Sequence, residues 1–209
     1  MKSEIYCRTK FEMEYFDFHT HRDKKNSCKS CTLEDLQRGL DLLENQKISL
    51  QFHPWHLPEK YGGLPDEFIE AAKSDNIYAI GEIGLDRLQG PSLEVQKAYL
   101  KDLLNLAEGL HKPVILHVVR CADEILQMLK NYPALTVIWH GFRGKKELFE
   151  RLVKANIFVS LHHSMLDKDD FTDYLKQNSK YHNKIGLESD DCELEIEELY
   201  RTLESKINE

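Results

Sequence analysis

The chain has 209 residues, of which 41% are hydrophobic and 31% charged, a composition typical of a folded protein rather than a disordered one. Its 36 acidic and 28 basic residues give a net charge of −8, which argues against a broad basic surface that holds nucleic acid by phosphate neutralisation alone. The sequence contains no apolar run of signal-peptide or membrane-span length, and its five cysteines are an odd number. We therefore expect reduced thiols, a cytoplasmic location and no membrane association.

Short β-branched or aromatic runs alternate with amphipathic stretches along most of the chain. We expect seven strands, at residues Tyr15–Thr20, Ile48–His53, Ile77–Ile80, Val114–His117, Thr136–Trp139, Ile157–Leu161 and Lys184–Glu188. Helical periodicity covers Leu33–Leu43, Leu93–Leu110, Ala122–Leu129, Lys145–Lys154, Phe171–Lys176 and a last acidic segment with Ile196, Leu199, Tyr200 and Leu203 on one face. This alternation predicts a parallel sheet, either closed into a barrel or open and doubly wound.

The sequence favours a barrel over an open sheet, and one domain over two. A Gly-rich phosphate loop does not follow the first strand, which disfavours a dinucleotide-binding open sheet. No Pro-, Gly- or Ser-rich linker divides the chain, so we predict a single domain over residues 1–209. An eight-stranded barrel usually has about 250 residues, and the shortfall lies between His21 and Ile48, where Cys28–Thr32 offers only a brief strand. We therefore predict a TIM-type α/β barrel that is abbreviated or distorted.

Metal-binding residue types follow the predicted strands. His19 and His21 are two residues apart at the end of the first strand, and strand alternation places both side chains on the same side. Four more residues of this kind come at the ends of later strands: Glu82, His117, His140 and Asp190. The carboxyl ends of parallel strands open on one face of a barrel, so all six would converge at one mouth. A single strand-end histidine is more often structural, but six coincidences together predict a metal site.

Positively charged and aromatic residues lie near the same predicted mouth. Arg120 follows His117 and Arg143 follows His140, and the planar guanidinium of Arg143 suits a phosphate contact. Trp55 either stacks on a base or sugar of a substrate or walls the barrel rim.

Six motifs, with Gln96 in the helix after the third, resemble those of the TatD-type metal-dependent hydrolases (TatD-related DNases) of the amidohydrolase superfamily. They are, in order, FDFHTH, FHPWH, AIGEIGLD, KPVILH, HGFRG and LESDD, and they extend from about Tyr15 to Asp191. The resemblance implies a centre of two divalent metal ions on a barrel. One ion would be bound by His19, His21, Glu82 and Asp190. Glu82 would bridge to a second ion held by His117 and His140.

The resemblance also places His53, in FHPWH, beside the metals and in contact with the substrate. The sequence departs from the family pattern in three places. The region before FHPWH is short, Arg120 lies three residues beyond His117 where the family often has His-Ser-Arg, and Ser189 stands where threonine is usual. These departures leave the substrate open.

Imidazole and carboxylate ligands suit several divalent ions, including Mg, Mn and Zn. Two such ions lower the pKa of a shared water and stabilise charge on the attacking and leaving oxygens. We expect Asp190 and Glu82 to be the catalytic residues, with Asp190 orienting the water and accepting its proton.

The leading hypothesis is a phosphodiesterase, a 3′-to-5′ exonuclease acting on DNA ends or short oligonucleotides, a substrate class that the resemblance supplies. The alternative is hydrolysis of small esters, lactones or amides, because the same ligands serve carbonyl chemistry. A metal-binding scaffold without activity is the third reading, and the intact Glu82 and Asp190 count against it. Nothing in the sequence indicates a protein partner.

Overall fold

The computed structural model describes residues 15–208, in which eight parallel strands close into a barrel in chain order. The strands are β1 (Asp17–Thr20), β2 (Ser27–Cys31), β3 (Lys47–Leu50), β4 (Ile77–Asp86), β5 (Val114–Val119), β6 (Val137–Phe142), β7 (Phe158–His162) and β8 (Ile185–Glu188). β8 pairs with β1 and closes the ring. The predicted TIM-type α/β barrel is confirmed.

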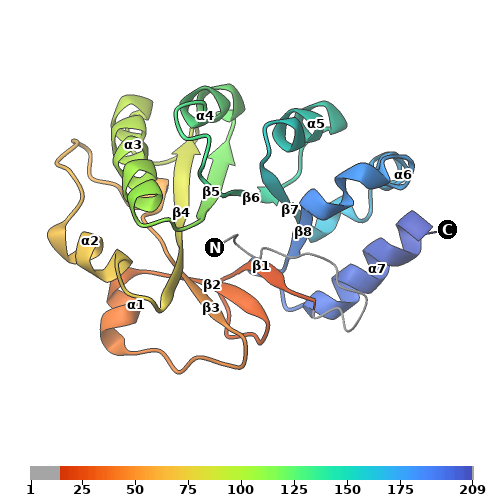
Figure 1. The fold of residues 1–209 in the computed structure, drawn as a ribbon, viewed down its shortest axis with the longest axis horizontal. Helices are drawn as coiled ribbons and strands as arrows, with labels where there is room; N and C mark the ends of the chain where they lie inside the picture. The colour runs from red at the N-terminus through yellow and green to blue at the C-terminus, as the bar shows by residue number, and fades with distance from the viewer. Residues whose placement is uncertain (1–14, 209) are drawn as a thin grey trace.

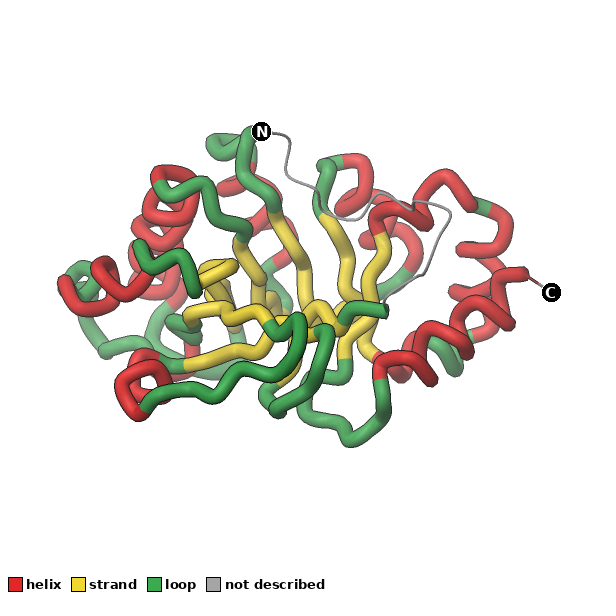
Figure 2. The backbone as a smooth tube through the Cα atoms, turned by 60° about the horizontal axis from the view of Figure 1, so that its bottom comes forward, coloured by secondary structure: helices red, strands yellow, loops and turns green. Residues whose placement is uncertain are grey.

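Helices cover the strands on the left, top and right of Figure 1, whereas loops border β2 and β3 at the bottom, and Figure 2 shows the strands between the helices. The helices are α1 (Leu33–Arg38), α2 (Asp66–Ala72), α3 (Leu93–Gly109), α4 (Ala122–Leu129), α5 (Lys146–Lys154), α6 (Asp169–Gln177) and α7 (Ile196–Asn208). Short 3₁₀ helices are η1 (Pro54–His56), η2 (His163–Met165) and η3 (Ser179–Lys184). Residues 21–26 join β1 to β2 without a helix, and α1 has only six residues, so the helical layer is thinnest beside β1, β2 and β3.

The brief segment that the sequence left uncertain is a true barrel strand. β2 pairs in parallel with β1 on one side and with β3 on the other. The helix that follows is shorter than the predicted Leu33–Leu43. It starts with a capping box, in which Thr32 Oγ1 accepts from the Asp35 amide and the Asp35 carboxylate accepts from the Thr32 amide. It stops at Gly39, whose φ of +86° no helix accommodates.

Two strand boundaries differ from the prediction in ways that affect the site. β4 continues to Asp86 instead of ending at Ile80, so Glu82 lies within the strand. β3 ends at Leu50 instead of His53, so His53 lies in the loop and accepts a hydrogen bond from the amide of Trp55 in η1. α2 had no counterpart in the prediction, because its seven residues give too short a periodic pattern.

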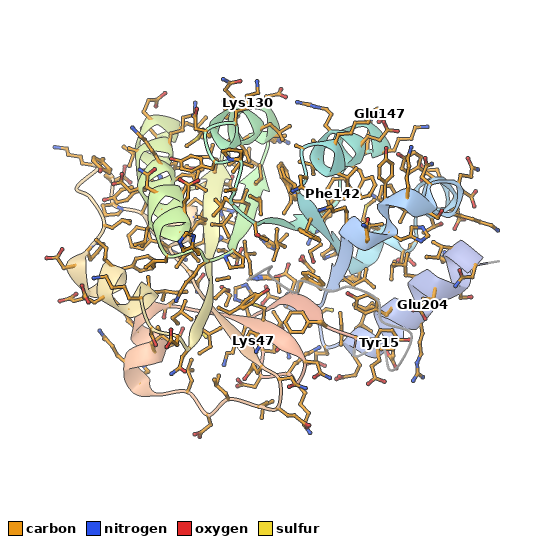
Figure 3. All side chains as sticks on the ribbon, viewed as in Figure 1. Tyr15, Lys47, Lys130, Phe142, Glu147 and Glu204 are labelled. Atoms are coloured by element: carbon orange, nitrogen blue, oxygen red, sulfur yellow. The ribbon has the colours of Figure 1, made fainter. Side chains whose placement is uncertain are left out.

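The last helix holds the seam between β8 and β1. The rings of Tyr15 and Tyr200 stack with centroids 5.1 Å apart, and the Tyr15 hydroxyl donates to Glu204 of α7 (Figure 3). The Tyr200 hydroxyl donates to the Phe16 carbonyl and accepts from the Leu187 amide. Because one hydroxyl bonds to the backbone on both sides of the seam, the ends of β1 and β8 are fixed relative to each other.

Among residues 15–208 no helix is both long and apolar enough to cross a membrane.

Candidate metal centre

The carboxylate of Glu82 lies among five histidine rings and divides them into two groups. Its Oε1 is 3.1 Å from His19 Nε2 and 3.0 Å from His21 Nε2. Its Oε2 is 2.9 Å from His140 Nε2, 3.4 Å from His117 Nδ1 and 3.5 Å from His53 Nε2. Glu82 is only 3% exposed, so each oxygen faces its own set of ring nitrogens and almost no solvent.

Asp190 completes the first of these groups. It follows β8 by two residues, and its amide donates to the His19 carbonyl while its own carbonyl accepts from the His21 amide. Its φ of +51° turns the chain at this point. The carboxylate Oδ1 lies 4.0 Å from His19 Nε2 and 3.8 Å from His21 Nε2. These backbone hydrogen bonds therefore place Asp190 beside both histidines.

Two buried carboxylates stand behind the histidines of the second group. Asp86 Oδ2 is 3.2 Å from His117 Nε2, the ring nitrogen that points away from Glu82. Glu188 Oε1 accepts from the Gly141 amide and lies 3.4 Å from His140 Nδ1. Each histidine thus has one nitrogen toward Glu82 and the other toward a separate carboxylate.

The donor atoms fit divalent metal ions. The groups His19–His21–Glu82 and His53–Glu82–His117 each present one ligand atom per residue with all separations within 4.8 Å. Ligands that share an ion at about 2.1 Å lie roughly 3 Å or a little more apart, which is the spacing found here. His19 Nδ1 is buried without a hydrogen-bond partner, so only its Nε2 side is engaged. Imidazole with carboxylate is also the donor set of catalytic divalent ions.

The charges in the site are arranged around an anionic Glu82. Burial raises the pKa of this carboxyl, but His19 and His140 outweigh burial and leave it well below its usual range. Burial lowers the pKa of His140, whereas Glu82 and Glu188 raise it to a net value well above the ordinary one. The pKa of His53 is lowered, mainly by burial. A buried carboxylate held ionised in this way is poised to bind cations.

The two arginines predicted to contact substrate are both exposed near the barrel mouth. Arg143 follows β6. Burial, together with the charge of Arg143, lowers the pKa of His162, at the end of β7, to about 4. Arg120 follows β5 with a φ of +55°, and its carbonyl accepts from Arg87 Nε. The structure brings the six predicted metal ligands and His53 together, whereas the roles of all these side chains stay predictions.

No role was predicted from the sequence for Asp86 or Glu188, although they lie in the motifs AIGEIGLD and LESDD. Side chains alternate along a strand, so Asp86 shares a face with Glu82, and Glu188 is likewise two residues before Asp190. This two-residue spacing was the signal in the sequence that could have pointed to both carboxylates. It could not have shown that Asp86 faces His117 of the adjacent strand β5, or that Glu188 faces His140 of β6, a strand that does not pair with β8.

Known proteins share both sequence and fold with this chain. It is 35% identical to the "Uncharacterized metal-dependent hydrolase YjjV" of Escherichia coli K12 over 136 residues, 61% of this chain and 52% of the relative. It is 32% identical to the "3'-5' ssDNA/RNA exonuclease TatD" of Erwinia billingiae over 112 residues, 52% of this chain and 43% of the relative. The chain therefore spans about half the length of these curated relatives.

The crystal structure of the YjjV TatD homologue from Escherichia coli K12 has the same fold, with a TM-score of 0.68 and 20% identity. That alignment covers 92% of this chain and 90% of the other. A family model described as "TatD related DNase" matches residues 8–192. With the barrel and the order of its motifs, this match establishes that the chain belongs to the TatD related DNase family.

Proposed function

We propose that this protein is a metal-dependent hydrolase that cleaves phosphodiester bonds, with DNA ends or short oligonucleotides as substrates. The observation that carries the proposal is the Glu82 carboxylate, whose two oxygens face separate groups of ring nitrogens, as expected of a ligand that bridges two ions. A metal-dependent hydrolase and an exonuclease among the relatives support the same reading. A cytoplasmic location stays a prediction.

The residues of the two groups would hold one divalent ion each, Mg, Mn or Zn. The first ion would be held by His19, His21, Asp190 and Glu82, and the second by His117, His140 and Glu82. Such ions supply a nucleophilic water at neutral pH and stabilise charge on the oxygens of the scissile group.

Three side chains near the proposed ions would orient water, bind substrate or accept a proton. Asp190 is 21% exposed at the mouth, so its carboxylate can orient an incoming water and accept its proton. Burial lowers the pKa of His53, which favours the neutral ring, and a neutral ring can hydrogen-bond a substrate oxygen without adding charge. Arg143 would bind a phosphate oxygen beside the mouth.

An Asp190→Asn variant is expected to lose roughly 100-fold or more in kcat, because an amide cannot accept the proton of the attacking water and general-base catalysis contributes about 10²–10⁴-fold. Single-turnover cleavage of an oligonucleotide measures the effect, with bound metal quantified on the same sample. Full turnover with a full metal complement would remove Asp190 from this role.

An Arg143→Gln variant is expected to raise KM for a phosphodiester about tenfold, with kcat little changed, because one charge-assisted hydrogen bond to substrate is lost. Arg151→Gln, on the outer face of α5 where Arg151 pairs with Asp123, is the matched control. Equal KM values for the two variants would refute the contact.

The direct test of the function is turnover of end-labelled single-stranded DNA by protein that has been treated with chelator and reloaded with Mg, Mn or Zn. Metal-dependent loss of nucleotides from the 3′ end supports the exonuclease reading. Tight metal binding without DNA cleavage would contradict it, and an ester and lactone panel would then test the carbonyl alternative.

A further inference from the structure

We propose that Asp86 is a positioning residue: its carboxylate fixes the ring of His117 for metal binding and, through the same oxygen, holds the indole of Trp55 at the edge of the site. The inference rests on the proposed two-metal function and adds to it a residue that controls one ion and an adjoining substrate surface.

The carboxylate of Asp86 is 2% exposed and has a partner for each oxygen. Oδ2 accepts from Trp55 Nε1 at 2.6 Å and lies 3.2 Å from His117 Nε2. Oδ1 accepts from the amides of Leu88 at 2.7 Å and Gln89 at 3.2 Å. Four nitrogens therefore converge on one buried anion, and two of them belong to side chains at the mouth.

The backbone of Asp86 is held as firmly as its side chain. Gln96, a buried residue of α3, accepts from the Asp86 amide at 2.7 Å and donates to the Asp86 carbonyl at 2.9 Å. The same side-chain amide also donates to the carbonyl of Pro91 at 2.8 Å. Because α3 bonds to Asp86 in both directions, the end of β4 cannot shift relative to the helix without breaking buried hydrogen bonds.

The contact with Asp86 determines which ring nitrogen of His117 carries the proton. An ionised carboxylate only accepts hydrogen bonds, so His117 donates to it from Nε2. In the neutral ring the lone pair then lies on Nδ1, the nitrogen that faces Glu82 Oε2 at 3.4 Å. A metal-binding histidine commonly has such a partner on its outer nitrogen, which fixes the tautomer and the ring orientation.

Trp55 is the second side chain that Asp86 holds. It is 41% exposed, yet its ring centroid lies 5.5 Å from that of His117 and 4.7 Å from that of His53. The hydrogen bond from its indole nitrogen keeps an exposed aromatic surface at a fixed place next to a predicted metal ligand and a predicted substrate contact. A flat apolar surface there is suited to a nucleobase or sugar.

An Asp86→Asn variant tests the proposal, because an amide has one acceptor oxygen and cannot serve both pairs of donors. Calorimetric titration of chelator-treated protein with Mn is expected to show one of two ions bound about 10- to 100-fold more weakly, the usual cost of losing an outer partner of a ligand. The other ion should bind as in the wild type. Nitrogen-15 NMR of the metal-free variant should show that His117 no longer holds its proton only on Nε2.

Trp55→Phe is the matched control, since it removes a donor from the same oxygen, keeps an aromatic ring and leaves His117 bonded. Wild-type Mn affinity is expected for it. Equal affinities in Asp86→Asn and the wild type would overturn the proposal.

The His117 tautomer in the wild-type protein provides a test that needs no variant. A proton on Nδ1 in the metal-free protein would overturn the proposal even if Asp86→Asn failed to fold. If the wild type bound one ion or none, the two-metal function would fail, whereas the tautomer would still report on Asp86 separately.

Discussion

A Glu82→Gln variant is expected to lose more than about 100-fold in turnover and to bind fewer than two ions. Losing an outer partner of a metal ligand already costs about 10–100-fold, and Glu82 is the residue that both ligand groups share. An amide has one acceptor oxygen, so it cannot serve the His19–His21 group and the His117–His140 group at once. One ion should therefore lose this ligand, and loss of the negative charge of the carboxylate should weaken binding of the other ion.

Metal content after chelation and reloading, together with oligonucleotide cleavage, measures this result. Glu70→Gln is the control, since Glu70 is an exposed carboxylate of α2 that pairs with Lys73, and an exposed pair of this kind contributes little. It should retain full metal content and activity. A Glu82→Gln protein that still holds two ions would show that Glu82 is not the bridging ligand.

A Gly84→Ala variant is expected to lose roughly 3 kcal/mol or more of unfolding free energy, from strain and overpacking together. Gly84 of β4 pairs with His117 of β5 and has a φ of +153°. An added Cβ would lie 1.9 Å from the His117 carbonyl oxygen and 2.8 Å from its carbonyl carbon. The clash is with backbone, so β5 must move, and a predicted metal ligand moves with it.

Thermal unfolding followed by circular dichroism should show a midpoint about 6–12 °C lower, given about 2–4 °C per kcal/mol for a chain of this size. The protein should be free of metal, because bound ions would add their own stabilisation. Gly109→Ala, at the end of α3 where no heavy atom lies within 4 Å of the added Cβ, should be neutral or slightly stabilising. Matching midpoints for the two variants would contradict the close approach of β4 and β5 at Gly84.

The order of strands and helices could be predicted from the sequence, because periodicity and β-branched composition are local properties. β2 and α2 are exceptions. Ser27–Cys31 has no branched apolar residue and becomes a strand only by pairing with β1 and β3, and the seven residues of α2 give too short a periodic pattern. The predicted end of β4, at Ile80, was wrong for a related reason. The glycines at residues 81 and 84 are typical of residues that follow a strand, yet β5 pairs with this stretch as far as Asp86.

The sequence by itself determined the family resemblance, the barrel and the candidate metal ligands, because residue type and spacing carry that information. Only the tertiary structure decided which oxygen of Glu82 faces which histidines and where His53 and Asp190 lie relative to them. It also decided that Asp86 stands behind His117 while holding Trp55. These relations join side chains from different strands and loops, and their distances depend on barrel closure and strand register, which no local pattern of residues encodes.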